Sequence, residues 1–175
     1  IVGGTRSGKS CCMDHILTNL IANNPLEKME LYLAQVAKSD LVIYKNTKQT
    51  RAFADNLEKT LVMLEYLCDK IKERTELITP YRERGMVSNY KDYNKLKGLD
   101  NMSTCYVAFD EMSSIFDTKG DTKNIKSIKG EITKCCNEIA QIGASVGVFL
   151  ICSLQRPTVD NMPSFLKAMC TITIS

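Results

Sequence analysis

Gly3-Gly4-Thr5-Arg6-Ser7-Gly8-Lys9-Ser10 is the stretch that decides the fold of this chain. It fits the pattern G-x-x-x-x-G-K-[ST], a loop whose backbone N–H groups cradle the phosphates of a nucleotide. The glycines at positions 3 and 8 permit positive φ angles, so that successive N–H groups converge on phosphate oxygens. Lys9 would place a cation on the β- and γ-phosphates, and the Ser10 hydroxyl would coordinate Mg²⁺. The stretch therefore predicts a site for ATP with Mg²⁺.

The residues on both sides of this loop fit the same interpretation. Ile1-Val2 has the character of the last residues of a buried strand, and residues 11–21 form a helical pattern. The amino-terminus of that helix would direct its dipole toward the bound phosphates. The nucleotide-binding residues that we expect are Gly3, Gly4, Thr5, Arg6, Ser7, Gly8, Lys9, Ser10 and Cys11.

Composition places the chain among ordinary soluble proteins. Its 175 residues suffice for one well-packed domain and are too few for two. The net charge of +3 permits a nucleic-acid partner without arguing for one. The eight cysteines mostly follow apolar patterns, which favours reduced, buried thiols over a zinc site. There is no signal peptide and no apolar run long enough to span a bilayer, and we interpret the chain as a domain from a longer protein.

A second group of polar residues follows the apolar run Cys105–Phe109. The run ends in Asp110-Glu111, the Walker B pattern of nucleoside triphosphatases. Asp110 would hold the Mg²⁺ shell, and Glu111 would polarise the water that attacks the γ-phosphate. A buried strand that merely ends in two exposed acids is the alternative, and the complete phosphate loop upstream favours the functional interpretation.

Strand-like and helical patterns alternate along the chain. This order predicts an α/β fold of three layers, with a mostly parallel sheet and helical crossovers. The expected strands are residues 29–34, 105–109, 146–153 and 169–174, with a short extended piece at 41–44. The expected helices after the first are residues 50–78, stopped by Thr79-Pro80, and residues 125–142, preceded by a polar loop.

Residues 81–101 lose this periodicity. Basic side chains alternate there with Tyr81, Tyr90 and Tyr93, a composition that suits a surface for tracking a nucleic-acid backbone and stacking on bases. A plain solvated loop with a short helix explains the same residues.

The whole set of motifs resembles the FtsK/SpoIIIE family of RecA-like motor ATPases. The most specific part is residues 147–161, GVFLICSLQRPTVDN, which is similar to the family's G-x-x-L-x-x-x-T-Q-R-P-x-V-D stretch. The resemblance implies a single RecA-like P-loop domain over residues 1–175. It also implies a hexameric ring that moves double-stranded DNA, and a cytoplasmic domain in a membrane-anchored parent protein. The resemblance also implies that Lys9, Glu111 and Gln155 are the catalytic residues. Of these, Gln155 would sense the γ-phosphate.

Two departures from the family pattern accompany the resemblance. The family's Asp-x-Lys signature is replaced by residues 34–41, AQVAKSDL, and its Thr before Gln-Arg-Pro is Leu154. The family also includes coupling ATPases of conjugative elements and ATPase modules of type VII protein secretion. A protein-export module, or a regulatory nucleotide-binding module with little turnover, therefore remains an alternative. The basic segment 81–97 favours DNA.

Ring ATPases commonly complete the site with an arginine from a neighbouring subunit. Arg74 is our first candidate, because residues 72–77 resemble the family's Glu-Arg-Arg-Tyr segment. An ordinary surface ion pair is the alternative for Arg74. Arg82 and Arg84 are the next candidates.

Overall fold

The computed structural model describes residues 1–2, 7–36 and 40–154. The helices are α1 (Lys9–Asn23), α2 (Leu57–Glu83), α3 (Tyr90–Tyr93), α4 (Ser113–Phe116) and α5 (Lys123–Ile142), with 3-10 turns η1 (Asp40–Tyr44) and η2 (Gly143–Val146). The strands are β1 (Met29–Gln35), β2 (Thr50–Ala54), β3 (Thr104–Asp110) and β4 (Val148–Cys152).

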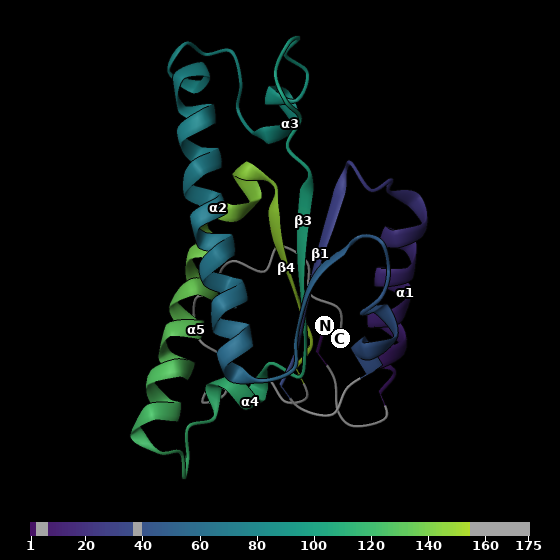
Figure 1. Ribbon diagram of the computed structural model, residues 1–175, viewed down its shortest axis with the longest axis vertical. Helices are drawn as coiled ribbons and strands as arrows, with labels where there is room; N and C mark the ends of the chain where they lie inside the picture. The colour runs from purple at the N-terminus through teal and green to yellow at the C-terminus, as the bar shows by residue number, and fades with distance from the viewer. Residues whose placement is uncertain (3–6, 37–39, 155–175) are drawn as a thin grey trace.

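The four strands form one parallel sheet in the order β2-β1-β3-β4. Helix α1 covers one face, and α2 and α5 cover the other, so that the sheet is the middle of three layers (Figure 1). This arrangement confirms the predicted α/β class. Because all four strands are parallel, their carboxyl ends meet at one edge of the sheet, where α1 begins and α4 lies (Figure 1).

Two apolar clusters hold the layers together. On the α1 face, Met13 and Leu17 pack against the β1 residues Met29, Leu31 and Leu33. On the other face, the larger cluster joins α2 and α5 to the sheet through Leu64, Leu67, Ile71, Phe109, Ile132 and Ile139. Each such side chain contributes about 1.5–3 kcal/mol when fully buried. The two clusters explain why apolar residues recur at helical spacing in α2 and α5 and run almost continuously in the strands.

The structure corrects three predicted boundaries. Thr50–Ala54 is strand β2, not the first turns of a helix, and α2 begins only after Asn56, whose side chain accepts a hydrogen bond from Lys59 N. Residues 40–44 form the 3-10 turn η1, not an extended piece. Pro80 lies inside α2 and does not end it. The last turn is held by the buried Ile78 and by the edge-to-face contact of Tyr81 with Tyr93.

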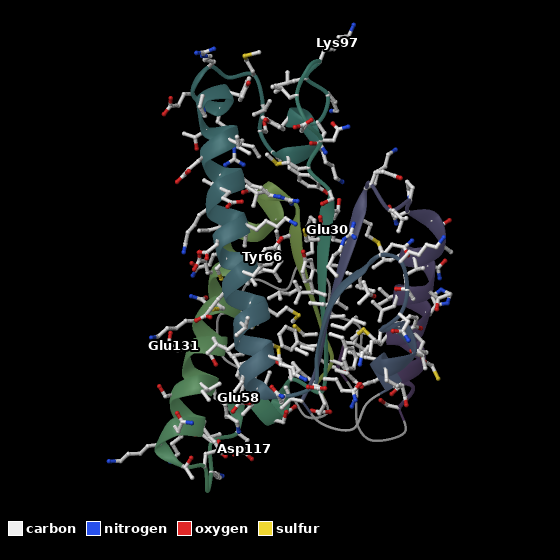
Figure 2. All side chains as sticks on the ribbon, in the orientation of Figure 1. Glu30, Glu58, Tyr66, Lys97, Asp117 and Glu131 are labelled. Atoms are coloured by element: carbon white, nitrogen blue, oxygen red, sulfur yellow. The ribbon has the colours of Figure 1, made fainter. Side chains whose placement is uncertain are left out.

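Of the two interpretations of residues 81–101, the structure contradicts base stacking by Tyr90 and Tyr93 and shows the short helix α3. Tyr90 and Tyr93 are each only 5% exposed, and the Tyr90 hydroxyl lies 3.0 Å from Thr104 Oγ1. These rings belong to the core, so they have no free face for a base. Figure 2 shows Lys97, in the same segment, at one end of the molecule and Asp117, after α4, at the other. The predicted strand at residues 169–174 lies outside the described residues.

A buried polar network closes the edge of the sheet where the strands begin. The Glu30 carboxylate accepts hydrogen bonds from Lys70 Nζ at 2.5 Å, Tyr32 Oη at 2.6 Å and Ser103 Oγ at 2.8 Å. Burial alone would raise the pKa of Glu30, but these bonds outweigh it and lower the pKa to about 2. The carboxylate is therefore ionised and satisfied at neutral pH, which ties β1 to α2 and to the start of β3.

Candidate functional site

The phosphate loop leads into α1 through a left-handed glycine. Gly8 has φ 86° and precedes the helix, and Cys12 N donates the first helical hydrogen bond to the Gly8 carbonyl at 2.9 Å. A side chain at this position would be strained whatever space is available, because L-residues rarely adopt this φ. The local sequence Gly8-Lys9-Ser10 thus fixes where the helix starts and how the loop enters it.

The first turn of α1 is suited to an anion. Its side chains include no acidic residue, and its N-cap residue is Gly8, which has no side chain to cap the N–H groups. Ser7, Ser10 and Cys11 are exposed there, and Lys9 is partly exposed. The N–H groups at a helix amino-terminus carry a partial positive charge and bind phosphate readily. The positions Gly3, Gly4, Thr5 and Arg6 of the predicted set lie outside the described residues.

The strand segment before the loop lies beside β4. Val2 forms a parallel bridge with Leu154, the Ile1 amino group donates to Cys152 O at 2.7 Å, and Leu154 N donates to Ile1 O at 2.9 Å. The spatial order is therefore Val2, β4, β3. The chain at the end of β4 therefore lies between Val2 and the acidic pair.

The acidic pair ends β3 at the same edge. Asp110 is the last residue of the strand, in register with Gln35 of β1, and both Asp110 and Glu111 are partly buried. Glu111 has φ 59°, and it is the single non-glycine residue with positive φ in the described part of the chain. A left-handed non-glycine residue costs about 1–2 kcal/mol, and such strain clusters at functional sites. The bend turns the chain sharply out of β3, so that Glu111 does not continue the strand.

Gly8, Lys9, Ser10, Asp110 and Glu111 are thus brought to one edge of the sheet, as the sequence predicts. Their roles toward a nucleotide remain predictions. Gln155 lies outside the described residues, immediately after Leu154 at the end of β4. Sequence reasoning missed a hydroxyl at this edge, that of Ser153, which is 1% exposed. The signal that was available is a serine within an otherwise apolar strand end.

Arg74 is not the exposed arginine that a neighbouring subunit could use. It is 6% exposed, and its guanidinium donates to Val146 O at 2.9 Å and to Ser103 Oγ at 3.2 Å. These bonds hold α2 to η2 and to the start of β3, which makes Arg74 a structural residue. Arg82 is half-buried and donates to Ser145 O at 3.4 Å. Arg84, at the carboxyl end of α2, is exposed and stays a candidate.

An apolar cavity of about 720 Å³ lies away from this edge, between β2 and α2. Its walls include Phe53, Val62, Met63 and Tyr66. It lies on the sheet face that α2 covers, whereas α1 lies on the opposite face, so the cavity is separate from the start of α1.

Comparison with known proteins identifies the family. The profile of the FtsK/SpoIIIE family matches residues 1–130. The chain belongs to the FtsK/SpoIIIE family. Among curated FtsK/SpoIIIE relatives, it is 25% identical to the DNA translocase FtsK of Chlorobaculum tepidum over 178 residues, covering 96% of this chain and 20% of the relative. It is also 25% identical to the DNA translocase FtsK of Helicobacter pylori, covering 95% of this chain and 19% of the relative.

Solved structures of FtsK/SpoIIIE-type ATPases share the fold. The monomer of the pCW3 conjugation coupling protein TcpA with ATPγS superposes with a TM-score of 0.81 at 22% identity, covering 96% of this chain and 45% of TcpA. ATPases 2 and 3 of EssC from Geobacillus thermodenitrificans give a TM-score of 0.78 at 20% identity, covering 95% of this chain and 29% of EssC. The predicted P-loop ATPase fold is confirmed. The chain spans about a fifth of the length of the FtsK relatives.

Proposed function

We propose that this chain is the ATP-hydrolysing motor domain of a DNA translocase. The proposal rests on one edge of the sheet. There α1 begins after Gly8, which has a left-handed φ, and β3 ends in Asp110, followed by Glu111 with its strained backbone. Membership of the FtsK/SpoIIIE family and the two DNA translocase relatives support the same activity.

The residues at this edge fit ATP and Mg²⁺. Gly8 has the left-handed φ that a phosphate-cradling loop needs, and the hydroxyl of Ser10 and the carboxylate of Asp110 are hard oxygen ligands of the kind that Mg²⁺ prefers. Bound Mg²⁺ would neutralise charge on the phosphates. Lys9 would bind the β- and γ-phosphates, and Glu111 would orient the attacking water and accept its proton. Gln155, which follows Leu154 in the sequence, would sense whether the γ-phosphate is present.

Double-stranded DNA is the polymer that we propose is moved, with chromosome segregation or conjugative transfer as the process. The DNA translocase relatives and the likeness to a conjugation coupling protein support this proposal. Tyr90 and Tyr93 do not support it, because both are buried. We further propose that residues 1–175 form one RecA-like domain of a longer protein, which works as a hexameric ring. This domain would be cytoplasmic, in a parent anchored to a membrane. Within the described residues, no helix has the length and apolar character to cross a membrane.

A module that drives protein secretion is the second candidate. The structural likeness to EssC and to a type VII secretion ATPase of Thermomonospora curvata favours it, because these folds match along nearly the whole chain. A regulatory module that binds nucleotide without turnover would need neither Glu111 nor its strained backbone.

The test is steady-state ATP hydrolysis by the longer protein that contains this chain, measured with double-stranded DNA, with an unfolded polypeptide and with neither. DNA is expected to increase turnover, and Glu111→Gln is expected to abolish that increase while ATP binding remains. Stimulation by the polypeptide alone would assign the chain to secretion. Turnover of Glu111→Gln equal to that of wild type would remove the catalytic role of Glu111.

A further inference from the structure

Ser153 carries a buried hydroxyl without a hydrogen-bond partner among the described residues. The residue is 1% exposed, and its Oγ makes no hydrogen bond to the described part of the chain. Buried side-chain hydroxyls in native proteins are almost always paired with protein, water or ligand. The hydroxyl of Ser153 therefore indicates a partner that residues 1–2, 7–36 and 40–154 do not provide.

The backbone of Ser153 places it directly beside Asp110. Its N–H donates to Phe109 O and its carbonyl accepts from Met112 N, each at 2.9 Å, so it stands opposite Asp110 across the ladder. On the other side of β4, the next residue, Leu154, donates to Ile1 O. Ser153 thus lies between the segment that enters the phosphate loop and the predicted Mg²⁺ ligand.

The register also shows that the Ser153 hydroxyl and Asp110 lie on the same face of the sheet. Ala108 and Ile151 are register partners and both belong to the cluster under α1, whereas their successors Phe109 and Cys152 belong to the cluster under α2 and α5. Because side chains alternate along a strand, Ser153 lies on the α1 face, as does Asp110. This is the face that α1 covers (Figure 1).

The neighbouring position cannot supply this hydroxyl. Leu154 stands where the family pattern has threonine, and its side chain is 2% exposed within the cluster under α2 and α5. Hence, among the described residues that follow β4, Ser153 is the one that brings a hydroxyl to the α1 face.

We propose that Ser153 Oγ donates a hydrogen bond to an oxygen of the γ-phosphate of bound ATP. The contact rests on the proposed nucleotide site. It makes Ser153 a substrate-contacting residue that distinguishes the triphosphate from the diphosphate, because ADP lacks the accepting oxygen. The contact also joins the γ-phosphate to Met112 through the Ser153 backbone, and so to the bend at Glu111.

Calorimetric titration of wild type and Ser153→Ala with ATPγS and with ADP, each with Mg²⁺, tests this contact. One hydrogen bond to a charged acceptor corresponds to a loss of about tenfold, so Ser153→Ala is expected to bind ATPγS about tenfold more weakly and ADP about equally well. The ratio of the two affinities within one variant is insensitive to the folded fraction, so a partly unfolded variant still tests the contact. Ser145→Ala is the matched control, because Ser145 is partly exposed and its Oγ donates to Ile142 O, in the turn after α5.

An unchanged ratio of ATPγS to ADP affinity in Ser153→Ala overturns the proposal. So does an equal loss for both nucleotides, which would place the hydroxyl on another part of the ligand or in the fold alone. Failure of wild type to bind either nucleotide is a different result, and it contradicts the proposed function itself.

Discussion

Met112 N donates a hydrogen bond to the carbonyl of Ser153 at 2.9 Å. This bond joins the residue after Glu111 to the end of β4, across the point where β3 stops. It continues the pairing of β3 with β4 past the left-handed bend, and it holds the bend against relaxation. This hydrogen bond therefore links Ser153, just after β4, to the segment that follows the acidic pair.

The backbone strain at Glu111 can be measured as a difference in the free energy of unfolding between two variants. Glu111→Gly and Glu111→Ala both lose the carboxylate and differ only by a methyl group. Because glycine adopts φ 59° freely, the glycine variant is expected to be more stable than the alanine variant by about 1 kcal/mol. Urea unfolding of the two variants measures the difference. Equal free energies of unfolding would show that the bend stores no strain.

At Gly8, in the phosphate loop, the test is to add a side chain at a left-handed φ. Gly8→Ala is expected to lower the free energy of unfolding by about 1–2 kcal/mol, because φ 86° is left-handed. The reason is not a clash, because the added methyl group would meet no atom within 4 Å among the described residues that are not its neighbours in the chain or in the helix. Gly130→Ala is the matched control. Gly130 is exposed inside α5, and alanine there is expected to stabilise by about 0.5–1 kcal/mol. A loss of the same size in both variants would contradict the explanation by φ.

Arg74 is expected to support the fold and not a neighbouring active site. Arg74→Ala leaves the Val146 carbonyl and the Ser103 hydroxyl without their donor, and we expect a loss of about 2–4 kcal/mol in the free energy of unfolding. Arg84→Ala, at an exposed position, is expected to change stability by less than about 0.5 kcal/mol. If Arg84 acts on the neighbouring site, its alanine variant will lose ATP turnover in the assembled protein while remaining as stable as wild type. Wild-type stability of Arg74→Ala would contradict the structural role.

Acid should destabilise the fold through Glu30. The pKa of Glu30 is lowered from 4.5 to about 2, so the ionised carboxylate stabilises the folded chain above about pH 4.5. This contribution, about 2–3 kcal/mol because solvent partly screens the carboxylate, is lost as the pH falls through the folded pKa near 2. Glu30→Gln is expected to remove this part of the pH dependence in urea unfolding between pH 4.5 and 2, whereas Glu76→Gln, on an exposed part of α2, keeps it. Identical pH profiles for Glu30→Gln and wild type would exclude this role.

Much of the fold could be predicted because its signals are local. The phosphate loop sets the start of α1, the apolar run before Asp110 becomes β3, and the helical spacing of α5 is unambiguous. The register that places Asp110 at the same edge as Gly8 follows from a parallel sheet. These features depend on residues adjacent in sequence or on the general geometry of α/β folds.

The errors came from contacts between distant residues. Thr50–Ala54 joins the sheet because β1 pairs with it, although its apolar spacing also suits a helix. Tyr90 and Tyr93 are buried by α2 and the start of β3, which composition does not reveal. Arg74 finds its partners on Val146 and Ser103, residues that lie 72 and 29 positions away. The bend at Glu111 likewise depends on Ser153, so no local pattern predicts its φ angle.

The most direct measurement is a calorimetric titration of ATP with Mg²⁺ into wild type and Lys9→Ala. Lys9 would make a charge-assisted contact with the phosphates, so its removal is expected to weaken binding by about tenfold or more, equivalent to roughly 1.5–3 kcal/mol. Lys91→Ala, a charge loss at the exposed Lys91 in α3, is the control and is expected to bind ATP as wild type does. Equal affinity of wild type and Lys9→Ala for ATP, or no binding by wild type, would contradict the assignment of this loop.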